Sequence, residues 1–467
     1  MLEESLEESK SGNAECPENP ETAGVGSDAS GAENPETAGV GSDASGAENP
    51  ESADVGSDAS GAENPETASA GSDASGVEKP ENKDKNVASD SAANSGNTGS
   101  IADSVTEEII NKVTERAYKE RRLRGEKLDL GIDIAIREMD IMSRVHGTDG
   151  YSVYVGIPFC PSTCLYCSFT SNPIFKYKDK IKDYLLAVKK ELEWTASNMS
   201  DRYLDTVYIG GGTPTTLNPE ELDELLGYIT TILPWENVRE FTIEAGRADS
   251  ITEEKLEVIK KYPITRISVN PQTMSDETLK LIGRHHTVEQ FVNAFKMVRE
   301  AGFDNINSDI IIGLPGENTE DVKHTIDELV KLAPDSLTVH SLAIKRASRL
   351  KKWLDENELE ITMDYEKAMS ICAEGAKKLG LKPYYLYRQK QMAGNLENTG
   401  YSVPGKEGLY NILIMEEIQS IVAIGAGSVS KCVHNNGLIE RCDNVKDIDL
   451  YLSKIDEMIE RKQKLFK

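Results

Sequence analysis

Between residues 150 and 345 the sequence alternates six times between a short β-rich run and a turn or amphipathic stretch. The β-rich runs are SVYVGIP, DTVYIGG, REFTIEA, TRISVNPQ, NINSDIIIGLP and DSLTVHSL. Helical patterns separate them, as in the stretch from Asp179 to Ser197. Alternating βα units of this length favour parallel strands with right-handed crossovers. We therefore expect an α/β fold, a partial (β/α)6 TIM-like barrel over residues 150–345.

The flanking regions read differently. Residues 101–149 predict a helical lead-in, with two helices between 104 and 145 because apolar positions recur at helical spacing. After residue 346 the regularity weakens to a helix over 365–379, a strand over 383–387, the run QSIVAIGAGSVS and a terminal helix from Val445. We expect residues 346–467 to form a smaller C-terminal domain that closes over the barrel mouth.

The first hundred residues repeat one unit. NPETAGVGSDASGAE starts at Asn19 and returns at Asn34, Asn49 and Asn64, with a decayed copy at Lys79. A fixed period can indicate a solenoid, but this unit has almost no large apolar residue, so stacked copies would bury no core. With 22 acidic against 4 basic residues, residues 1–100 predict a disordered, self-repelling tail.

Composition excludes several classes of protein. The net charge is −28, and the remaining chain is still mildly acidic, which argues against a nucleic-acid partner. The start, MLEESLEESK, lacks the apolar stretch of a secretory signal. No run of about 18 apolar residues predicts a membrane span. Unpaired thiols suggest a reducing compartment, so we expect a cytoplasmic protein.

Three cysteines follow the first predicted strand, in YVGIPFCPSTCLYCSF. The spacing of Cys160, Cys164 and Cys167 suits three thiolates at three corners of one [4Fe–4S] cube, which leaves one iron open to a small molecule. A structural zinc site would normally need a fourth ligand, and position 169 is Phe. A disulfide framework does not suit an odd count of seven cysteines.

Further motifs fall at the carboxyl ends of the predicted strands, where sites form in such barrels. Tyr154 lies on the first strand, where its ring could pack near the cluster or fill the core. GGGTPT, from Gly210 to Thr215, follows the second strand. Glycines let a backbone approach a ligand closely, and the loop carbonyls could accept from an ammonium; the same motif could be a plain tight turn.

Polar residues end the next strands. Glu244 ends the third, Gln272 ends the fourth, Asp309 lies on the fifth and Arg284 follows the fourth in LIGRHH. A carboxylate such as Glu244 or Asp309 can hold ribose hydroxyls or an ammonium, although strand-end polar groups are often only satisfied structural groups. The turn Gly313–Gly316 is expected to line an adenine slot.

Other polar residues carry weaker signals. His285 and His286 are adjacent and cannot share one helix face, so a metal pair is not expected. Cys372, Cys432 and Cys442 lack close spacing, and we expect buried or idle thiols rather than a second cluster.

In the C-terminal part, Arg388 and Lys390 stand near aromatic residues in YYLYRQKQMAGN. Their charges suit carboxylate recognition, although they could equally be ordinary surface charges. GAGS, from Gly425 to Ser428, resembles a loop of close backbone approach.

YVGIPFCPSTCLYC, GGGTPT, ISVNPQ with LIGR, DIIIGLP and GAGS occur here in one order. In them the chain resembles the radical S-adenosylmethionine (SAM) superfamily and, within it, the oxygen-independent coproporphyrinogen III oxidases (coproporphyrinogen dehydrogenases), from about Tyr151 to the C-terminus. LYRQKQMAGN and YNILIMEE make it most similar to the HemZ-type branch. Two features depart from the pattern: the repeat tail replaces a folded region, and Phe169 stands where the best-known oxidases carry a fourth cysteine.

The resemblance implies an iron–sulfur enzyme of porphyrin biosynthesis. Cys160, Cys164 and Cys167 would hold a [4Fe–4S] cluster. One electron from a flavodoxin- or ferredoxin-type donor would drive SAM cleavage to methionine and a 5′-deoxyadenosyl radical. Hydrogen abstraction from a propionate, loss of CO₂ and loss of one further electron would then leave a vinyl group, and two such events would convert coproporphyrinogen III to protoporphyrinogen IX. Arg388 and Lys390 would be candidate substrate contacts. The residues implied to contact SAM are Tyr154, Gly211, Gly212, Thr213, Glu244, Gln272, Arg284 and Asp309.

Two other functions remain open on the same scaffold. Heme-chaperone relatives carry an HNxxYW-type motif, whereas the comparable stretch here, Tyr410–Met415, reads YNILIM. The missing histidine and tryptophan favour the enzyme. A radical RNA-modifying enzyme would need a basic groove or an added binding module, which the acidic balance does not support.

Overall fold

A computed structural model describes residues 126–344, 349–357, 363–387 and 397–467. The predicted tail, the start of the lead-in, and Arg388 and Lys390 lie outside these ranges. The described end of the lead-in forms the single helix α2 (Glu126–Met142). Within the part of the chain that the structure describes, every helix is too short or too polar to traverse a lipid bilayer.

Eleven strands form one open sheet in the order β13-β12-β11-β1-β4-β5-β6-β7-β8-β10-β9. The seven neighbouring strands from β11 to β8 run parallel, and β10, β9, β12 and β13 add antiparallel edges. The six predicted βα units are therefore present. The strand bounds are β1 (Gly150–Ile157), β4 (Tyr203–Gly211), β5 (Glu240–Glu244), β6 (Arg266–Ser268), β7 (Ile306–Ile312), β8 (Ser336–Ser341), β9 (Lys382–Tyr387), β10 (Asn398–Ser402), β11 (Ser420–Ile424), β12 (Val429–Val433) and β13 (Ile439–Asp443).

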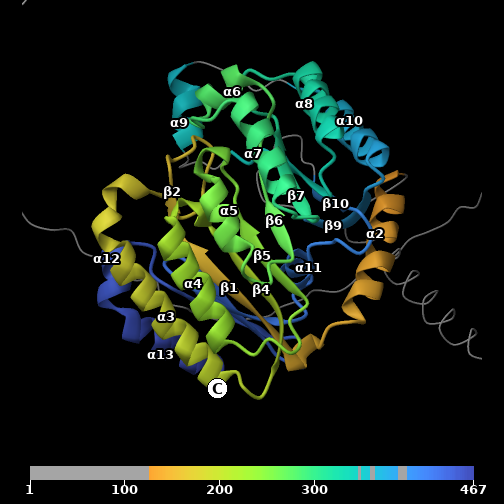
Figure 1. Cartoon of the computed structure of the whole chain (residues 1–467). Coiled ribbons are helices and arrows are strands. Elements are labelled where there is room, and N and C mark those ends of the chain that lie inside the picture. The colour runs from red at the N-terminus through yellow and green to blue at the C-terminus, as the bar shows by residue number, and fades with distance from the viewer. Residues whose placement is uncertain (1–125, 345–348, 358–362, 388–396) are drawn as a thin grey trace, which may run out of the picture. The chain divides into compact units, whose positions relative to one another are not determined.

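Helices follow the parallel strands and cover one side of the sheet, as Figure 1 shows for α3, α4, α5, α7 and α8. The C-terminal α12 and α13 pack against α3, and α10 packs against α8. The helix bounds are α3 (Ile181–Asn198), α4 (Pro219–Ile232), α5 (Glu253–Ile259), α6 (Asp276–Leu281), α7 (Val288–Glu300), α8 (Thr319–Leu332), α9 (Arg349–Glu356), α10 (Tyr365–Lys378), α11 (Leu409–Glu416), α12 (Ile448–Ser453) and α13 (Ile455–Leu465).

The beginnings of these helices are encoded locally. Asn218 caps α4 in a capping box with Glu221, and Pro219 occupies the first helical position. Thr287 with Gln290 forms the same box at α7, and α8 begins at a third one. Each box satisfies two backbone N–H groups that the helix itself leaves free. The short connections between strands and helices are thus set by nearby side chains.

The two faces of the sheet differ in polarity. Every second side chain along a strand faces the helices, and these side chains are apolar and fully buried, such as Val153, Val207 and Ile243. Their neighbours on the opposite face are polar. In register across the sheet these include Ser152, Thr206, Tyr208, Thr242, Arg266, Ser268, Asn307, Asp309 and Thr338. The apolar face forms the core, and the barrel interior offers hydrogen-bonding groups instead of a second apolar core.

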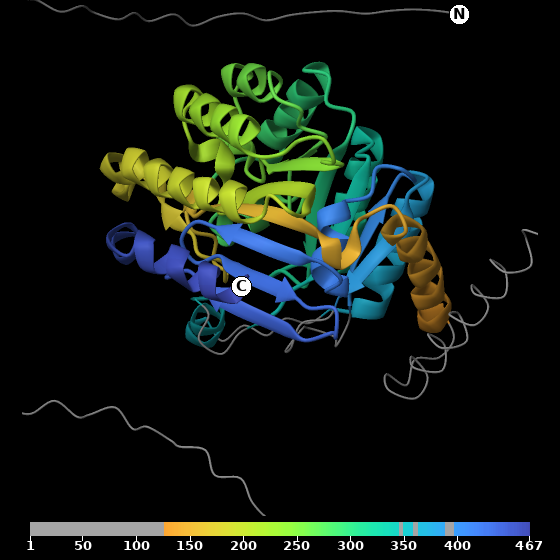
Figure 2. The same cartoon turned by 90° about the horizontal axis from the view of Figure 1, so that it is seen from below.

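Strands after residue 346 extend both edges of the same sheet. Figure 2 shows the blue strands beside the orange β1, and β11 pairs parallel with β1 from Tyr151 to Val155. A seventh parallel strand therefore comes from a part of the chain that we expected to form a smaller domain. The predicted boundary at residue 346 stays a prediction.

The segment from Lys406 into α11 lies at the end of the barrel opposite the expected mouth. Glu240 begins β5 and accepts hydrogen bonds from the backbone N–H groups of Leu409 and Tyr410, which begin α11. Arg266 begins β6 and donates to the carbonyl of Lys406 over 3.1 Å. These two buried charges need polar partners, and the segment from Lys406 into α11 supplies them. Within the described ranges, this segment thus covers the amino ends of β5 and β6, and the cover that we expected over the mouth stays a prediction.

Candidate functional site

The three predicted cluster ligands, here called the cluster cysteines (Cys160, Cys164 and Cys167), lie in one loop after β1. Cys160 lies in the short strand β2 (Phe159–Cys160), which pairs with β3 (Asn172–Pro173). Cys160 and Cys164 are each 8% exposed, Cys167 is half-buried, and all three are free thiols. Among the described residues no three His, Cys, Asp or Glu side chains stand close enough to share one metal ion. Ligands of a cube bind separate irons, so they need not converge on one point.

The GGG motif fixes the position of this loop. The N–H of Gly212 donates to the carbonyl of Ile157 over 2.8 Å, and that of Thr213 donates to the carbonyl of Phe159 over 2.7 Å. A Cβ on Gly212 would lie 2.6 Å from the Phe159 oxygen. Gly212 therefore needs to lack a side chain because the backbone of the cluster loop lies against it. This reason is separate from the close approach of a ligand that we expected.

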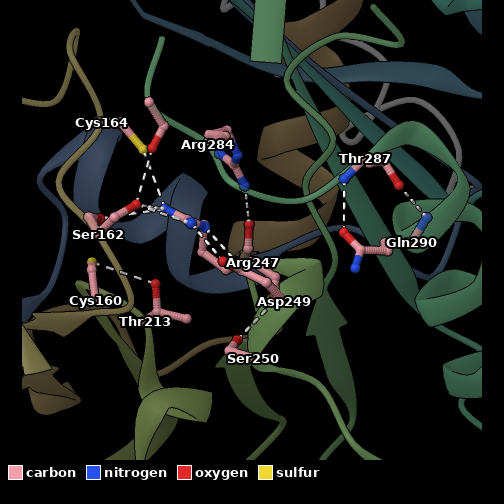
Figure 3. A network of polar contacts seen from close by, with 12 residues as sticks. Cys160, Ser162, Cys164, Thr213, Arg247, Asp249, Ser250, Arg284, Thr287 and Gln290 are labelled. Atoms are coloured by element: carbon pink, nitrogen blue, oxygen red, sulfur yellow. Dashed lines mark hydrogen bonds and ion pairs between the residues drawn. The ribbon is translucent and has the colours of Figure 1, made fainter. Parts of the chain in front are cut away.

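A buried arginine ties the cluster loop to the end of β5. Arg247 donates through Nη1 to the Cys164 sulfur over 3.6 Å and to Ser162, as Figure 3 shows. Its Nε and Nη2 donate to the two carboxylate oxygens of Asp249 over 2.9 and 2.7 Å. Thr213 donates to the Cys160 sulfur over 3.5 Å. Cys160 and Cys164 thus each have a side-chain hydrogen-bond donor, and Cys167 has donors in the Phe169 backbone and the Ser171 side chain.

Three tyrosines stack inside the barrel; Tyr154, Tyr208 and Tyr410 form the tyrosine stack. The ring centroids of Tyr208 and Tyr410 are 4.5 Å apart, and Tyr154 lies 6.1 Å from Tyr208 and 6.2 Å from Tyr410. Tyr208 donates a short hydrogen bond to Glu244. The predicted site residues Tyr154 and Glu244 are therefore brought together through Tyr208.

The pKa values of Glu244 and Asp309 are shifted in opposite directions, although both carboxylates line the interior. Burial raises the pKa of Glu244 to about 7, helped by the negative charge of Asp309 and opposed by the Tyr208 hydrogen bond. Burial also acts to raise the pKa of Asp309, but hydrogen bonds from His340, Asn307 and Thr338 together hold it below its usual range. Near neutral pH the site thus contains one firmly ionised carboxylate and one that titrates.

Gln272 and Arg284 occupy distinct positions near the same strand ends. Gln272 forms a bridge to Ile310, has φ of 68° and leaves its buried Oε1 without a partner among the described residues. A strained backbone with an unpaired acceptor is typical of a ligand site. Arg284 instead donates to Tyr166 over 3.0 Å and to the carbonyl of Asn270 over 2.8 Å. Arg284 therefore braces the cluster loop in this structure, and its contact with SAM stays a prediction.

The remaining predicted positions are placed as follows. In the predicted adenine turn, Gly313 has φ of 85°, and a Cβ there would meet the ring of Tyr365 at 2.9 Å. His286 is 3% exposed, and burial, followed by the Arg284 charge, lowers its pKa to about 3. Cys372 lies in the core and Cys432 is buried in β12.

The GAGS loop packs on the barrel. Gly425 has φ of 97°, and a Cβ there would lie 2.4 Å from the carbonyl oxygen of Gly156. Its N–H donates to Glu191 of α3 over 2.8 Å. The loop therefore does approach another backbone closely, beside the carboxyl end of β1.

Sequence reasoning missed three residues of this site. Tyr208 is two residues before GGGTPT and in register with Tyr154, so strand alternation could have found it. Arg247 follows Glu244 by three residues, and a basic residue so near a strand end was a usable signal. Tyr410 comes from a distant segment, and no local pattern placed it in the barrel.

Comparisons with known proteins identify the family of the chain. The radical SAM superfamily matches residues 154–329. The oxygen-independent coproporphyrinogen-III oxidase-like protein HemZ of Bacillus subtilis is 42% identical over 353 residues, which cover 74% of this chain and 70% of the relative. The heme chaperone HemW of the same organism is 33% identical over 218 residues, covering 46% of this chain and 57% of the chaperone.

A solved structure shares the fold. Coproporphyrinogen III oxidase (HemN) from Escherichia coli superposes with a TM-score of 0.53 at 20% identity, covering 72% of this chain and 74% of that one. The chain therefore belongs to the radical SAM superfamily, whose cofactors are a [4Fe–4S] cluster and S-adenosylmethionine, and within it to the family of oxygen-independent coproporphyrinogen-III oxidase-like proteins.

Proposed function

We propose that this protein is a radical SAM oxidoreductase that decarboxylates coproporphyrinogen III to protoporphyrinogen IX without oxygen. The observation that carries the proposal is the loop of three cysteines, two of them buried, at the carboxyl end of β1, next to an interior lined by carboxylates and tyrosines. A relative from Cereibacter sphaeroides named oxygen-independent coproporphyrinogen III oxidase, 26% identical over 292 residues, supports the choice of substrate.

The residues present fit the two cofactors. The cluster cysteines would hold three irons; burial raises the pKa of Cys160 to about 11, and iron would supply the positive charge that its thiolate needs. The unpaired Gln272 oxygen and the carboxylates of Glu244 and Asp309 offer acceptors for the ammonium and ribose of SAM. When bound, the two cofactors supply a carbon radical that removes a hydrogen atom from a substrate.

The chain's own residues would orient and enclose the reactants. The tyrosine stack and α11 fill the part of the barrel interior next to the amino ends of the strands, which keeps water from reaching the site from that end. The loop carrying the cluster cysteines is braced by Arg284 and by the hydrogen bond from Leu165 to the carbonyl of Ile282 over 2.8 Å. Rigid support of this kind holds reacting groups in one geometry.

Charge supports a substrate with several carboxylates. The sequence after β8 carries basic residues and no acidic residue over 345–352: Lys345, Arg346, Arg349, Lys351 and Lys352. In its described part, Arg349 begins α9 and donates to the carbonyl of Thr163 in the cluster loop over 3.3 Å. A basic residue such as Arg349 beside the cluster loop is suited to a propionate of a porphyrinogen. Arg388 and Lys390 remain proposed substrate contacts, and a flavodoxin- or ferredoxin-type protein the proposed electron donor.

A heme-chaperone function is the second candidate, because several relatives are named heme chaperones. The position of Tyr410 supports the enzyme instead. Tyr410 begins the stretch that we compare with the chaperone motif, yet it is 5% exposed and stacked on Tyr208. A residue buried in this way offers its oxygen poorly to a heme iron.

The test is an anaerobic assay of cluster-loaded protein with dithionite to reduce the cluster, SAM, coproporphyrinogen III and a one-electron acceptor for the electron that each decarboxylation releases. We expect 5′-deoxyadenosine to form together with a product that has lost two CO₂. Replacing any one of the cluster cysteines by alanine should abolish both products, whereas Cys372→Ala, in the core away from the loop, should retain them. SAM cleavage without any change in the porphyrinogen would refute the substrate, and stable heme binding without decarboxylation would favour the chaperone.

A further inference from the structure

Arg247 has no role in the function proposed above, yet it is one of the most deeply placed charges near the cluster loop. Its side chain is 4% exposed and that of its partner Asp249 is 20% exposed. The guanidinium is planar, so when two nitrogens face Asp249, Nη1 is left to face the loop (Figure 3). There it lies 3.6 Å from the sulfur of Cys164 and 3.2 Å from the hydroxyl of Ser162.

A hydrogen bond to a cluster sulfur affects the two redox states differently. One electron from a reductant makes the cluster and its thiolates more negative, and no bond to the protein forms or breaks and no proton moves. A cationic donor therefore stabilises the reduced state more than the oxidised state. Burial strengthens this preference because the charge is poorly screened.

Asp249 limits the effect of the arginine. Its carboxylate binds Nε and Nη2 and offsets the positive charge, while it also holds Nη1 toward Cys164. Removing either partner therefore has consequences of opposite sign. Loss of Arg247 removes the donor and leaves a negative group nearby, whereas loss of the Asp249 charge leaves the cation less compensated.

We propose that Arg247, positioned by Asp249, raises the reduction potential of the cluster that Cys164 helps to hold. The proposal rests on the proposed role of Cys164 as a cluster ligand, but it requires neither SAM nor a porphyrinogen. Arg247 is thus a positioning and tuning residue and not a catalytic one.

The experiment is an anaerobic redox titration of the cluster-loaded full chain, in the absence of SAM, that follows the spin signal of the reduced cluster. For Arg247→Met we expect the ratio of reduced to oxidised cluster at a given potential to fall about tenfold, a shift of about 59 mV to lower potential for one electron. Arg247→Lys keeps the charge without the fork and should shift less in the same direction. Asp249→Asn should shift to higher potential.

The matched control is Arg299→Gln, which breaks another half-buried pair, with Asp335 at 2.8 Å. Asp335 precedes β8 and so lies at the opposite end of the strands, and the control should leave the potential unchanged. If Arg247→Met changes the ratio less than twofold, or Asp249→Asn shifts it downward, the proposal is wrong.

Iron content separates the possible failures. If Arg247→Met binds no cluster, the signs of the Arg247→Lys and Asp249→Asn shifts decide the question. If the unmodified chain binds no cluster, both this inference and the assignment of the cluster cysteines fail. If it binds one that shows the expected shifts but does not act on the porphyrinogen, only the proposed function fails.

Discussion

A buried ion pair should decide how firmly the C-terminal helices hold the barrel. Glu191 of α3 and Lys462 of α13 are 0% and 1% exposed, and their charged atoms lie 2.5 Å apart. The carboxylate also accepts from the N–H of Gly425, the hydroxyl of Tyr451 and the amide of Asn444. Glu191 therefore joins the first crossover helix to the GAGS loop and to both terminal helices.

The two single substitutions should differ in cost. Glu191→Gln leaves a buried ammonium without its anion, which typically costs about 3–5 kcal/mol. Lys462→Met leaves a carboxylate that keeps its three neutral donors, so we expect a smaller loss of about 2 kcal/mol. In the double variant no unpaired charge remains, and it should be more stable than Glu191→Gln alone.

Urea unfolding of the cluster-loaded protein measures these differences. Trp194 is a local reporter, since its ring centroid lies 6.3 Å from that of Phe466 beyond α13, and far-UV circular dichroism reports the whole chain. Coincident transitions would justify comparing free energies. Additive losses in the double variant, within about 0.5 kcal/mol, would show that the two charges do not depend on one another and would refute the reasoning.

Two further predictions concern the site. Because burial raises the pKa of Glu244 to about 7, the carboxylate gains its charge as pH rises through 7, and a cationic ligand should bind more tightly above that pH. SAM affinity, measured anaerobically by equilibrium dialysis, should rise about tenfold from pH 6 to 8; Glu244→Gln measured in parallel should lack this rise, and an identical profile in both would contradict the role of Glu244. Gly212→Ala would place a Cβ 2.6 to 2.8 Å from three backbone atoms, so we expect the protein to lose more than about 2 kcal/mol of stability and to bind less iron. The control is Gly131→Ala, where a Cβ would meet no atom within 4 Å and should stabilise α2 by about 0.5–1 kcal/mol. Equal effects of the two substitutions would contradict the steric argument.

Short-range patterns in the sequence were enough to predict much of the fold. Strand and helix periodicity predicted the six βα units, and the capping residues that begin α4, α7 and α8 act within four residues of their partners. The family resemblance is confirmed, while the assignment of the CxxxCxxC cysteines as cluster ligands stays a prediction. These features depend on contacts between residues close together in the chain, so their signals remain visible without a structure.

Only the tertiary structure placed the partners that come from far along the chain. The pairing of β11 with β1, the entry of Tyr410 into the barrel and the bond between Glu191 and Lys462 each join residues more than 200 positions apart. Arg247 reaches Cys164 across 83 positions. Many distant residues could meet any given group, and packing of the whole core selects among them. The sequence alone therefore determined the parallel α/β architecture and the cysteine triad, while long-range packing decided which groups surround them, because burial and distance exist only once the chain has folded.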